Sequence, residues 1–456
     1  MSSQTKIKLL IGFLIGLIVG GGFIYVAFKV SNPPGAVSES EMPPPPPGTD
    51  GGEKIEGKNI KDLVAAIIAD GKSENLNNVD FSVSNTDESA IIVRGNGNLT
   101  VTGGRLNKTG NSSNVDASNF TGQNAVVLVG GGNAVLNNIE IVSDGEGANA
   151  VFSTGKNSKI TLQNGKIITK KDSSRGLDAT YSGSITAMDF EINTEGAHSG
   201  AVATDRGEGN ITVARGKLIT RGDGSPCIYS TGNISVTDST GEAFGSEIAV
   251  VEGKNSITLE RVNLTGHAKN GVMLYQSFSG DADVGEATLF ARDSTLTNRS
   301  NGAMFFVTNT KAVITLERVG LNQDGNVLIK AAKDRWGSDG QNGGDFTFNA
   351  KNEQLKGDVL VDSLSKARMN LSQNTNWIGS LNKDNEASFV SLYLDGTSRL
   401  VLTADSYITE LSCDDMEFKN IESNGFTIYY DKEKSPSLGG RTINLSGGGR
   451  IMPKNG

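Results

Sequence analysis

The chain has 456 residues, of which 58 are glycine and only 10 are proline, and its formal net charge is −9. Charges of both signs are interspersed without a basic block, which excludes the electrostatic footprint of a nucleic-acid-binding protein. Abundant glycine with little proline favours short strands joined by tight turns. Cys227 and Cys413 obey no metal-ligand spacing, so we expect two buried thiols, with a disulfide between them as the open alternative.

The amino-terminal region predicts a membrane anchor. Residues 9–28 form an uncharged apolar run, LLIGFLIGLIVGGGFIYVAF, whose length matches a helix that spans the hydrocarbon core of a bilayer. Lys6 and Lys8 precede it and predict a single-pass topology with a cytoplasmic amino terminus and an extracytoplasmic remainder. A cleaved signal peptide is the alternative, but the run is longer than a signal core, so we expect an uncleaved anchor.

Two features accompany this anchor. Gly12, Gly16 and Gly20 recur every four residues, a spacing that permits close approach of a second helix and hence self-association. Residues 31–52 contain five consecutive prolines, which predict a stiff polyproline linker that holds the following domain away from the membrane.

The segment 57–70, GKNIKDLVAAIIAD, is expected to cap the domain. Its apolar residues Ile60, Leu63, Val64, Ile67 and Ile68 stand at helical spacing. We therefore predict a short amphipathic helix that covers the first coil of the repeat domain.

A loose repeat occupies the middle of the chain. Apolar blocks begin at Asn149, Gly176, Gly200, Pro226, Ile248, Gly271 and Gly302. A second block such as ITLQNGKIIT or ITLERVNLT follows each, with alternating side chains and turn residues but no helical periodicity. Such a period predicts an all-β, right-handed parallel β-helix with about three strands per coil.

The predicted architecture has five parts. They are an anchor at 1–30, a Pro-rich linker at 31–52, an amino-terminal cap at 53–87, the β-helix at 88–411 and a carboxy-terminal β cap at 412–456. The last part is expected to form a hairpin and a final strand, because the repeat pattern ends after Leu411.

Apolar side chains in the first block predict both a core and an outer stripe. Its second and fourth positions should point inward, and its largely apolar third position outward. Met273, Tyr275, Met304 and Phe306 would form the later part of this stripe. We expect other parts of the chain to cover it, because parallel sheets are seldom bare, and otherwise the patch would bind a partner.

The coils SRGLDATYSGSITAMDFEINTEGAHSGAVATDRGEG, from Ser174, and SPCIYSTGNISV, from Ser225, resemble bacterial adhesin-like proteins of the pectin-lyase-like β-helix superfamily. That superfamily holds lyases, hydrolases and non-enzymatic adhesins, so the resemblance implies the fold and leaves the function to the sites.

The motifs of the enzymatic members are incomplete. Gly266-His267-Ala268 lacks the second glycine of the hydrolase Gly-His-Gly motif. The best candidates for lyase-like acid/base chemistry are Asp205, Arg206 and Glu208, with Asp178 one coil earlier and Glu252 two coils later. We expect a salt-bridged turn here and no enzyme activity, because acidic proteins present such triplets by chance.

Two other groups of residues suggest ligands. Asp281, Asp283 and Glu286 carry the oxygens that Ca²⁺ prefers, although they match no known calcium loop. Trp336 and Trp377 lie in Asn-, Asp- and Gly-rich loops, where an exposed indole would stack on a sugar, or alternatively would plug the coil.

The functional expectation follows from these parts together. A membrane anchor, a stiff spacer and a long repeat domain without a complete catalytic motif predict surface adhesion or carbohydrate binding. The partner would be a surface polysaccharide or another surface protein. A polysaccharide lyase or glycoside hydrolase is the alternative.

Overall fold

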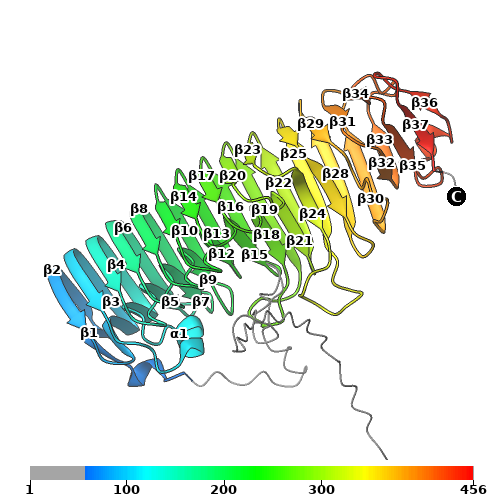
Figure 1. The fold of residues 1–456 in the computed structure, drawn as a ribbon. Helices are drawn as coiled ribbons and strands as arrows, with labels where there is room; N and C mark the ends of the chain where they lie inside the picture. The colour runs from blue at the N-terminus through cyan, green and yellow to red at the C-terminus, as the bar shows by residue number, and fades with distance from the viewer. Residues whose placement is uncertain (1–56, 455–456) are drawn as a thin grey trace, which may run out of the picture. The chain divides into compact units, whose positions relative to one another are not determined.

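The computed structural model describes residues 57–454, which form a parallel β-solenoid of about 16 turns (Figure 1). The parallel fold and the repeat are thus confirmed, whereas the right-handed winding stays a prediction. The predicted anchor at 9–28 and the linker at 31–52 lie outside the described residues. Within the described range, no helix is long and apolar enough to cross a membrane.

Each coil contributes strands to three faces, here called A, B and C. Face A contains β1 (Val64–Asp70), β5 (Val151–Thr154), β7 (Leu177–Thr180), β9 (Val202–Thr204), β12 (Ile228–Ser230), β15 (Ala249–Glu252), β18 (Val272–Tyr275), β21 (Phe305–Thr308), β24 (Val327–Ala331), β27 (Asp358–Val361), β32 (Ser406–Ile408), β35 (Thr427–Tyr430) and β37 (Arg450–Pro453). Face B contains β10 (Asn210–Ala214), β13 (Asn233–Thr237), β16 (Ser256–Glu260), β19 (Glu286–Arg292), β22 (Lys311–Glu317), β25 (Asp345–Lys351), β28 (Lys366–Ser372), β30 (Phe389–Leu394) and β33 (Glu410–Cys413).

Face C and the long strands complete the coils. Face C contains β11 (Lys217–Thr220), β14 (Thr240–Ala243), β17 (Asn263–Gly266), β20 (Thr295–Asn298), β23 (Gly320–Gln323), β26 (Gln354–Lys356), β29 (Asn376–Gly379), β31 (Arg399–Leu402) and β34 (Ile421–Glu422). Five long strands run across corners: β2 (Ser73–Val83), β3 (Glu88–Lys108), β4 (Val127–Ser143), β6 (Ser158–Thr169) and β8 (Ser184–Thr194). Because each strand pairs in parallel with the same strand of the next coil, equivalent side chains form columns along the stack.

The corner between faces B and C turns through a residue with positive φ. Successive coils place there Asn138, Asn164, Asp189, Arg215, Asp238, Arg261, Asp293 and Arg318, with φ between 50° and 58°. Asn and Asp tolerate this left-handed conformation better than other non-glycine residues, because their side chains bond locally. We call the charged positions from Asp189 to Arg318 the B–C ladder.

The register on face A corrects the predicted core positions. Val151, Leu177, Val202 and Ile228 align with one another and point into the main core. The predicted outward positions Val151, Val202, Ile228 and Met304 are therefore wrong. Because the corners differ in length, block starts chosen from the sequence do not occupy equivalent positions on successive strands. An error of one residue assigns a side chain to the opposite face of the sheet.

The outer column of face A is a different set. It comprises Phe152, Asp178, Ala203, Tyr229, Val250, Met273 and Phe306. Most of these side chains are buried, so the expectation that other chain segments cover the stripe is confirmed.

Three segments form that cover. The helix α1 (Val115–Thr121) is capped by the Asn114 side chain and by Gly122 in the left-handed conformation, and Figure 1 shows it beside β5 and β7. We call residues 276–285 the strap and residues 332–344 the Trp loop. The strap contacts Glu252 on β15, and the Trp loop places Trp336 against Tyr275.

The predicted helix at 57–70 is wrong. Only a 3₁₀ turn, η2 (Ile60–Asp62), precedes β1, which pairs in parallel with β3. Ile67 packs against the main core, whereas Ile68 packs under the cover of face A. Strand residues buried on both faces give a continuous apolar run, which resembles helical spacing.

The carboxy-terminal region continues the solenoid past the predicted end at Leu411. Strands β34, β35 and β37 still pair in parallel with earlier coils. Only β36 (Ile443–Asn444) runs antiparallel, against β37. The predicted hairpin followed by a last strand is thus reduced to this one short pair. Cys227 and Cys413 are both buried and free.

Candidate functional site

Asp178 and Asp205, two of the predicted catalytic residues, meet under the cover of face A at an arginine that was not predicted. Arg175, just before β7, donates to Asp178 at 3.1 Å and lies 2.8 Å from an oxygen of Asp205. It also donates to the side chain of Asn119 on α1 at 2.8 Å. Asp178 is fully buried and Asp205 is only 3% exposed. One guanidinium thus bridges two buried carboxylates from adjacent coils.

Arg206 has a different partner from the neighbouring Asp205. Its guanidinium donates to Asp281 of the strap at 2.7 and 3.1 Å and stacks over the ring of Phe120 on α1, 4.1 Å from the centroid. Glu208 instead forms an ion pair with Lys254 at 2.8 Å. The side chains of Asp205, Arg206 and Glu208 therefore have three different ion-pair partners.

A third carboxylate, Glu252 on β15, extends the buried group. It is fully buried and accepts hydrogen bonds from the hydroxyls of Tyr229, Tyr275 and Ser277, the Tyr275 bond measuring 2.9 Å. Ser277 belongs to the strap, so Glu252 anchors that segment to face A. We call Arg175, Asp178, Asp205, Arg206, Glu252 and Asp281 the face A cluster.

Burial dominates the protonation of this cluster. It raises the pKa of Asp178 to about 7, although Arg175 opposes the change. Burial also raises the pKa of Asp205, and the nearby Asp178 and Asp281 charges add to that effect. The pKa of Glu252 is likewise raised by burial, against the three hydroxyl hydrogen bonds that favour its ionised form. The cluster therefore retains protons at pH values where exposed carboxyls have lost them.

Carboxylates with raised pKa values are suited to proton transfer, but these are closed off from any substrate. The side chains of the lyase-like candidates bond to Arg175, to the strap or to Lys254, and neither Asp178 nor Asp205 has appreciable exposed surface. Acid/base chemistry on a polysaccharide would require the strap or α1 to move. The closed arrangement favours an internal structural role for the cluster.

The three candidate calcium ligands are not brought together. Asp281 bonds to Arg206, Asp283 pairs with Lys254 at 2.8 Å, and Glu286 begins β19 opposite Lys311. Across residues 57–454, no three His, Cys, Asp or Glu side chains are grouped as a metal site. Asp281 and Asp283 instead tie the strap to the solenoid.

The predicted aromatic ligand-binding residues are mostly internal. Trp377 on β29 is fully buried and donates its Nε1–H to the carbonyl of Gly357 at 2.9 Å, so it plugs the coil. Trp336 is half-buried and packs against Tyr275 and Phe278. Met304 lies in the core, and Phe306 is only 7% exposed. The exposed aromatic patch that the sequence suggested is thus filled by the Trp loop and the strap.

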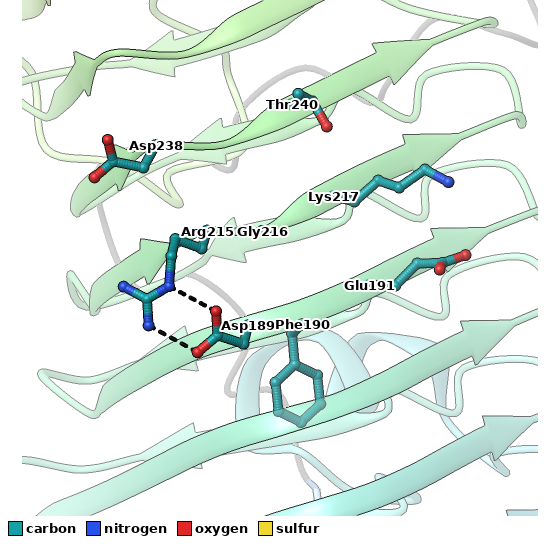
Figure 2. A pocket seen from close by; sticks show the side chains of 8 residues that line it. All are labelled: Asp189, Phe190, Glu191, Arg215, Gly216, Lys217, Asp238 and Thr240. Atoms are coloured by element: carbon teal, nitrogen blue, oxygen red, sulfur yellow. Dashed lines mark hydrogen bonds and ion pairs between the residues drawn. The ribbon is translucent and has the colours of Figure 1, made fainter.

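An open depression of about 450 Å³ lies instead on the B–C ladder (Figure 2). Arg215 and Asp189 pair through two contacts of 2.6 and 2.7 Å, and Asp238 follows on the next coil. Lys217 and Glu191 form the other side of the depression, on face C. This site offers charged donors and acceptors at the surface, in contrast to the buried cluster.

The ladder repeats the same pair further along the stack. Arg261 pairs with Asp238, and Arg318 pairs with Asp293, each with contacts of 2.6 and 3.0 Å. Sequence reasoning missed these residues because the alternating apolar residues of the second block drew attention to the core. The signal was present inside that block, whose fifth position is Asp189, Arg215, Asp238, Arg261 or Arg318 in coils where the fourth preceding residue is Ile.

Comparison with known proteins gives no relative: no family model, curated protein or solved structure matches this chain.

Proposed function

We propose that the protein is a membrane-anchored, extracytoplasmic adhesin-like rod that binds surface polysaccharide through the B–C ladder. The observation that carries this proposal is the contrast between two sets of charges. The carboxylates suited to catalysis are buried and engaged under the cover, whereas the ladder exposes Asp, Arg and Lys side chains around an open depression.

The chemistry of the depression suits a hydroxylated ligand. Sugar hydroxyls both donate and accept hydrogen bonds, so a surface with carboxylate acceptors beside guanidinium and ammonium donors can bind several at once. Lys217 has no ion-pair partner among residues 57–454, which leaves its three N–H donors for a ligand. Regular spacing along the ladder would allow a long chain to contact several coils in succession.

The amino-terminal region completes the proposal. In this reading, residues 9–28 hold the protein in the membrane and the Pro-rich residues 31–52 separate the solenoid from it.

A glycan array with the full chain in mild detergent tests this proposal. We expect binding to at least one polysaccharide class, and we expect the double variant Arg215→Ala/Lys217→Ala to weaken it by about tenfold or more. Arg299→Ala is the matched control, because it breaks an exposed Arg–Asp pair that lies outside both the ladder and the depression. Absence of binding to every glycan on the array would contradict the proposal.

The two buried carboxyls Asp178 and Asp205, with Arg206 next to Asp205 in the chain, favour one competing function, a polysaccharide lyase with a movable cover. An assay on pectin and polygalacturonate separates the two functions. Soluble unsaturated products that disappear in Arg206→Ala, with an unchanged melting temperature, would replace the binding proposal with the enzyme.

A further inference from the structure

The cover of face A is held at two points by arginines of the face A cluster. Arg175 joins α1 to β7 and β9 through Asn119, Asp178 and Asp205. Arg206 lies between the ring of Phe120 on α1 and the carboxylate of Asp281 in the strap. The two covering segments, far apart in sequence, therefore meet over one group of ionisable side chains.

This group carries more acids than bases. The titratable and charged side chains that face it are Asp178 on β7, Asp205 after β9, Tyr229 on β12, Glu252 on β15, Tyr275 on β18, Asp281 in the strap, and the two arginines. Beside them, Asp283 of the strap pairs with Lys254, which also pairs with Glu208. Asp178, Asp205 and Asp281 contact the two guanidiniums, whereas Glu252 accepts from hydroxyl groups. The contacts from α1 come from Asn119 and Phe120, which carry no charge.

The Asp178 carboxyl is the place in the face A cluster where a negative charge is least favourable. Asp178 Oδ1 is buried and has no hydrogen-bond partner, whereas its Oδ2 accepts from Arg175. A buried, unpaired carboxylate oxygen is costly when the group is ionised, so the protonated acid is favoured. The raised pKa values of Asp178 and Asp205 agree with this geometry.

We infer that the strap and α1 form a pH-sensitive closure over face A, which takes up protons when it closes and loosens as the pH rises through neutrality. This inference goes beyond the proposed binding function and does not depend on it. It rests on the excess of carboxyls in the face A cluster and on the direct contacts of both covering segments with that cluster.

The direction follows from proton linkage. Opening would admit water to Asp178 and Asp205 and remove Asp281 from their vicinity, which returns their pKa values toward the ordinary carboxyl value. The open form then binds fewer protons than the closed form near neutral pH. A higher pH therefore favours opening, and a lower pH favours closure.

Hydrogen exchange of the full chain, measured by mass spectrometry and expressed as protection factors, tests the closure. We expect protection of residues 276–285 to fall at least about tenfold between about pH 5 and about pH 8.5, the linkage expected from one pKa unit. The tryptophans give a second readout without mutation. Trp377 is fully buried, so acrylamide quenching should report on Trp336 at the edge of the strap, and quenching should increase with pH.

Two variants and one control sharpen the test. Asp178→Asn removes a titrating charge at constant shape, and we expect it to reduce the pH dependence of strap protection. Asp281→Ala removes the contact with Arg206 and should give low protection at every pH. Asp189→Asn changes an exposed carboxylate of the B–C ladder and should leave the strap unaffected.

Two results would overturn the inference. The first is strap protection that is constant across the pH range. The second is a pH dependence of the strap that Asp178→Asn and Asp205→Asn both leave unchanged, since the protons would then bind elsewhere. Either result can be obtained whether or not the protein binds a polysaccharide.

Discussion

The face A cluster and the B–C ladder use the same pair of residue types in opposite surroundings. On the ladder, Arg215 and Asp189 each keep a third or more of their side-chain surface exposed. In the cluster, Arg175 is 12% exposed and its partners Asp178 and Asp205 have almost no exposed surface. The ion pairs of the ladder and of the cluster therefore have similar contact distances but differ greatly in their access to water.

The difference shows that environment, more than geometry, decides what an ion pair does. Water screens an exposed pair, and the pair contributes little to stability. A buried pair carries a large desolvation cost, which makes each partner dependent on the other. The pKa of Asp189 is lowered by its hydrogen bonds with Arg215, whereas burial raises that of Asp178. Four experiments test this contrast.

Removal of Arg175 should have the largest effect. Arg175→Ala leaves two buried carboxylates without their shared guanidinium, and we expect a loss of about 3–5 kcal/mol in the free energy of unfolding. Urea unfolding near neutral pH measures it, and hydrogen exchange should place the loss in β7 and β9. A change no larger than that of an exposed arginine variant would refute the contrast.

The second-largest expected effect is the change in the free energy of unfolding with pH. The pKa of Asp178 in the folded protein, about 7, lies above its ordinary value of 3.8, so its contribution is complete below about pH 4 and is lost as the pH rises through about 7. We expect stability to fall by up to about 4 kcal/mol over that interval. Thermal unfolding from about pH 4 to about pH 8 measures this, with Asp178→Asn as the variant that should flatten the curve. An unchanged slope in Asp178→Asn would assign the effect to other groups.

Arg206→Ala should have a smaller effect, because its side chain is 29% exposed and water can reach Asp281 when it is absent. We expect a loss of about 1–2 kcal/mol, from the hydrogen bonds with Asp281 and the contact with Phe120. Arg206→Lys retains the charge but loses the planar stacking, and should recover part of the loss. Full stability of Arg206→Ala would show that the strap does not depend on this residue.

Arg215→Ala should have the smallest effect on stability. The Arg215–Asp189 pair is exposed and screened, so the melting temperature should stay within error at physiological salt. The matched comparison with Arg175→Ala, in the same buffer, measures the contrast directly. A large loss for Arg215→Ala would mean that the left-handed corner depends on its ion pair.

The fold was predictable because its signal is repeated. Alternating apolar residues and a period near 25 residues indicate stacked parallel strands in many coils at once, so a single irregular coil does not obscure them. The exact register between coils was not predictable, because the corners vary in length. Val151, the third residue of its block, pairs with Leu177, the second residue of the next block. The helix prediction for residues 57–70 was wrong for a related reason. Ile67 and Ile68 are half-buried and pack on opposite faces of β1, so the strand shows no simple alternation of apolar and polar residues.

The cluster was only half predictable. Asp178 stood out as a charged residue in an apolar column, and Asp205 and Arg206 as a charged corner. Their partners could not be found in the same way, since Asp281 is 75 residues from Arg206 in the chain. Local sequence also gives no measure of burial, which decides that Trp377 fills the core and that Asp178 keeps its proton.

The cover also changes how the stack would carry a mechanical load. Between most coils, tension along the axis acts on strand hydrogen bonds that join one coil to the next, so the weakest junction yields first. Under the cover, Arg206–Asp281, Arg175–Asn119 and Thr180–Phe120 join residues 75, 56 and 60 positions apart. These contacts act in parallel with the hydrogen bonds between strands, so they share the load and oppose the separation of the coils that they connect. A rod that is pulled at its ends should therefore rupture outside this region first.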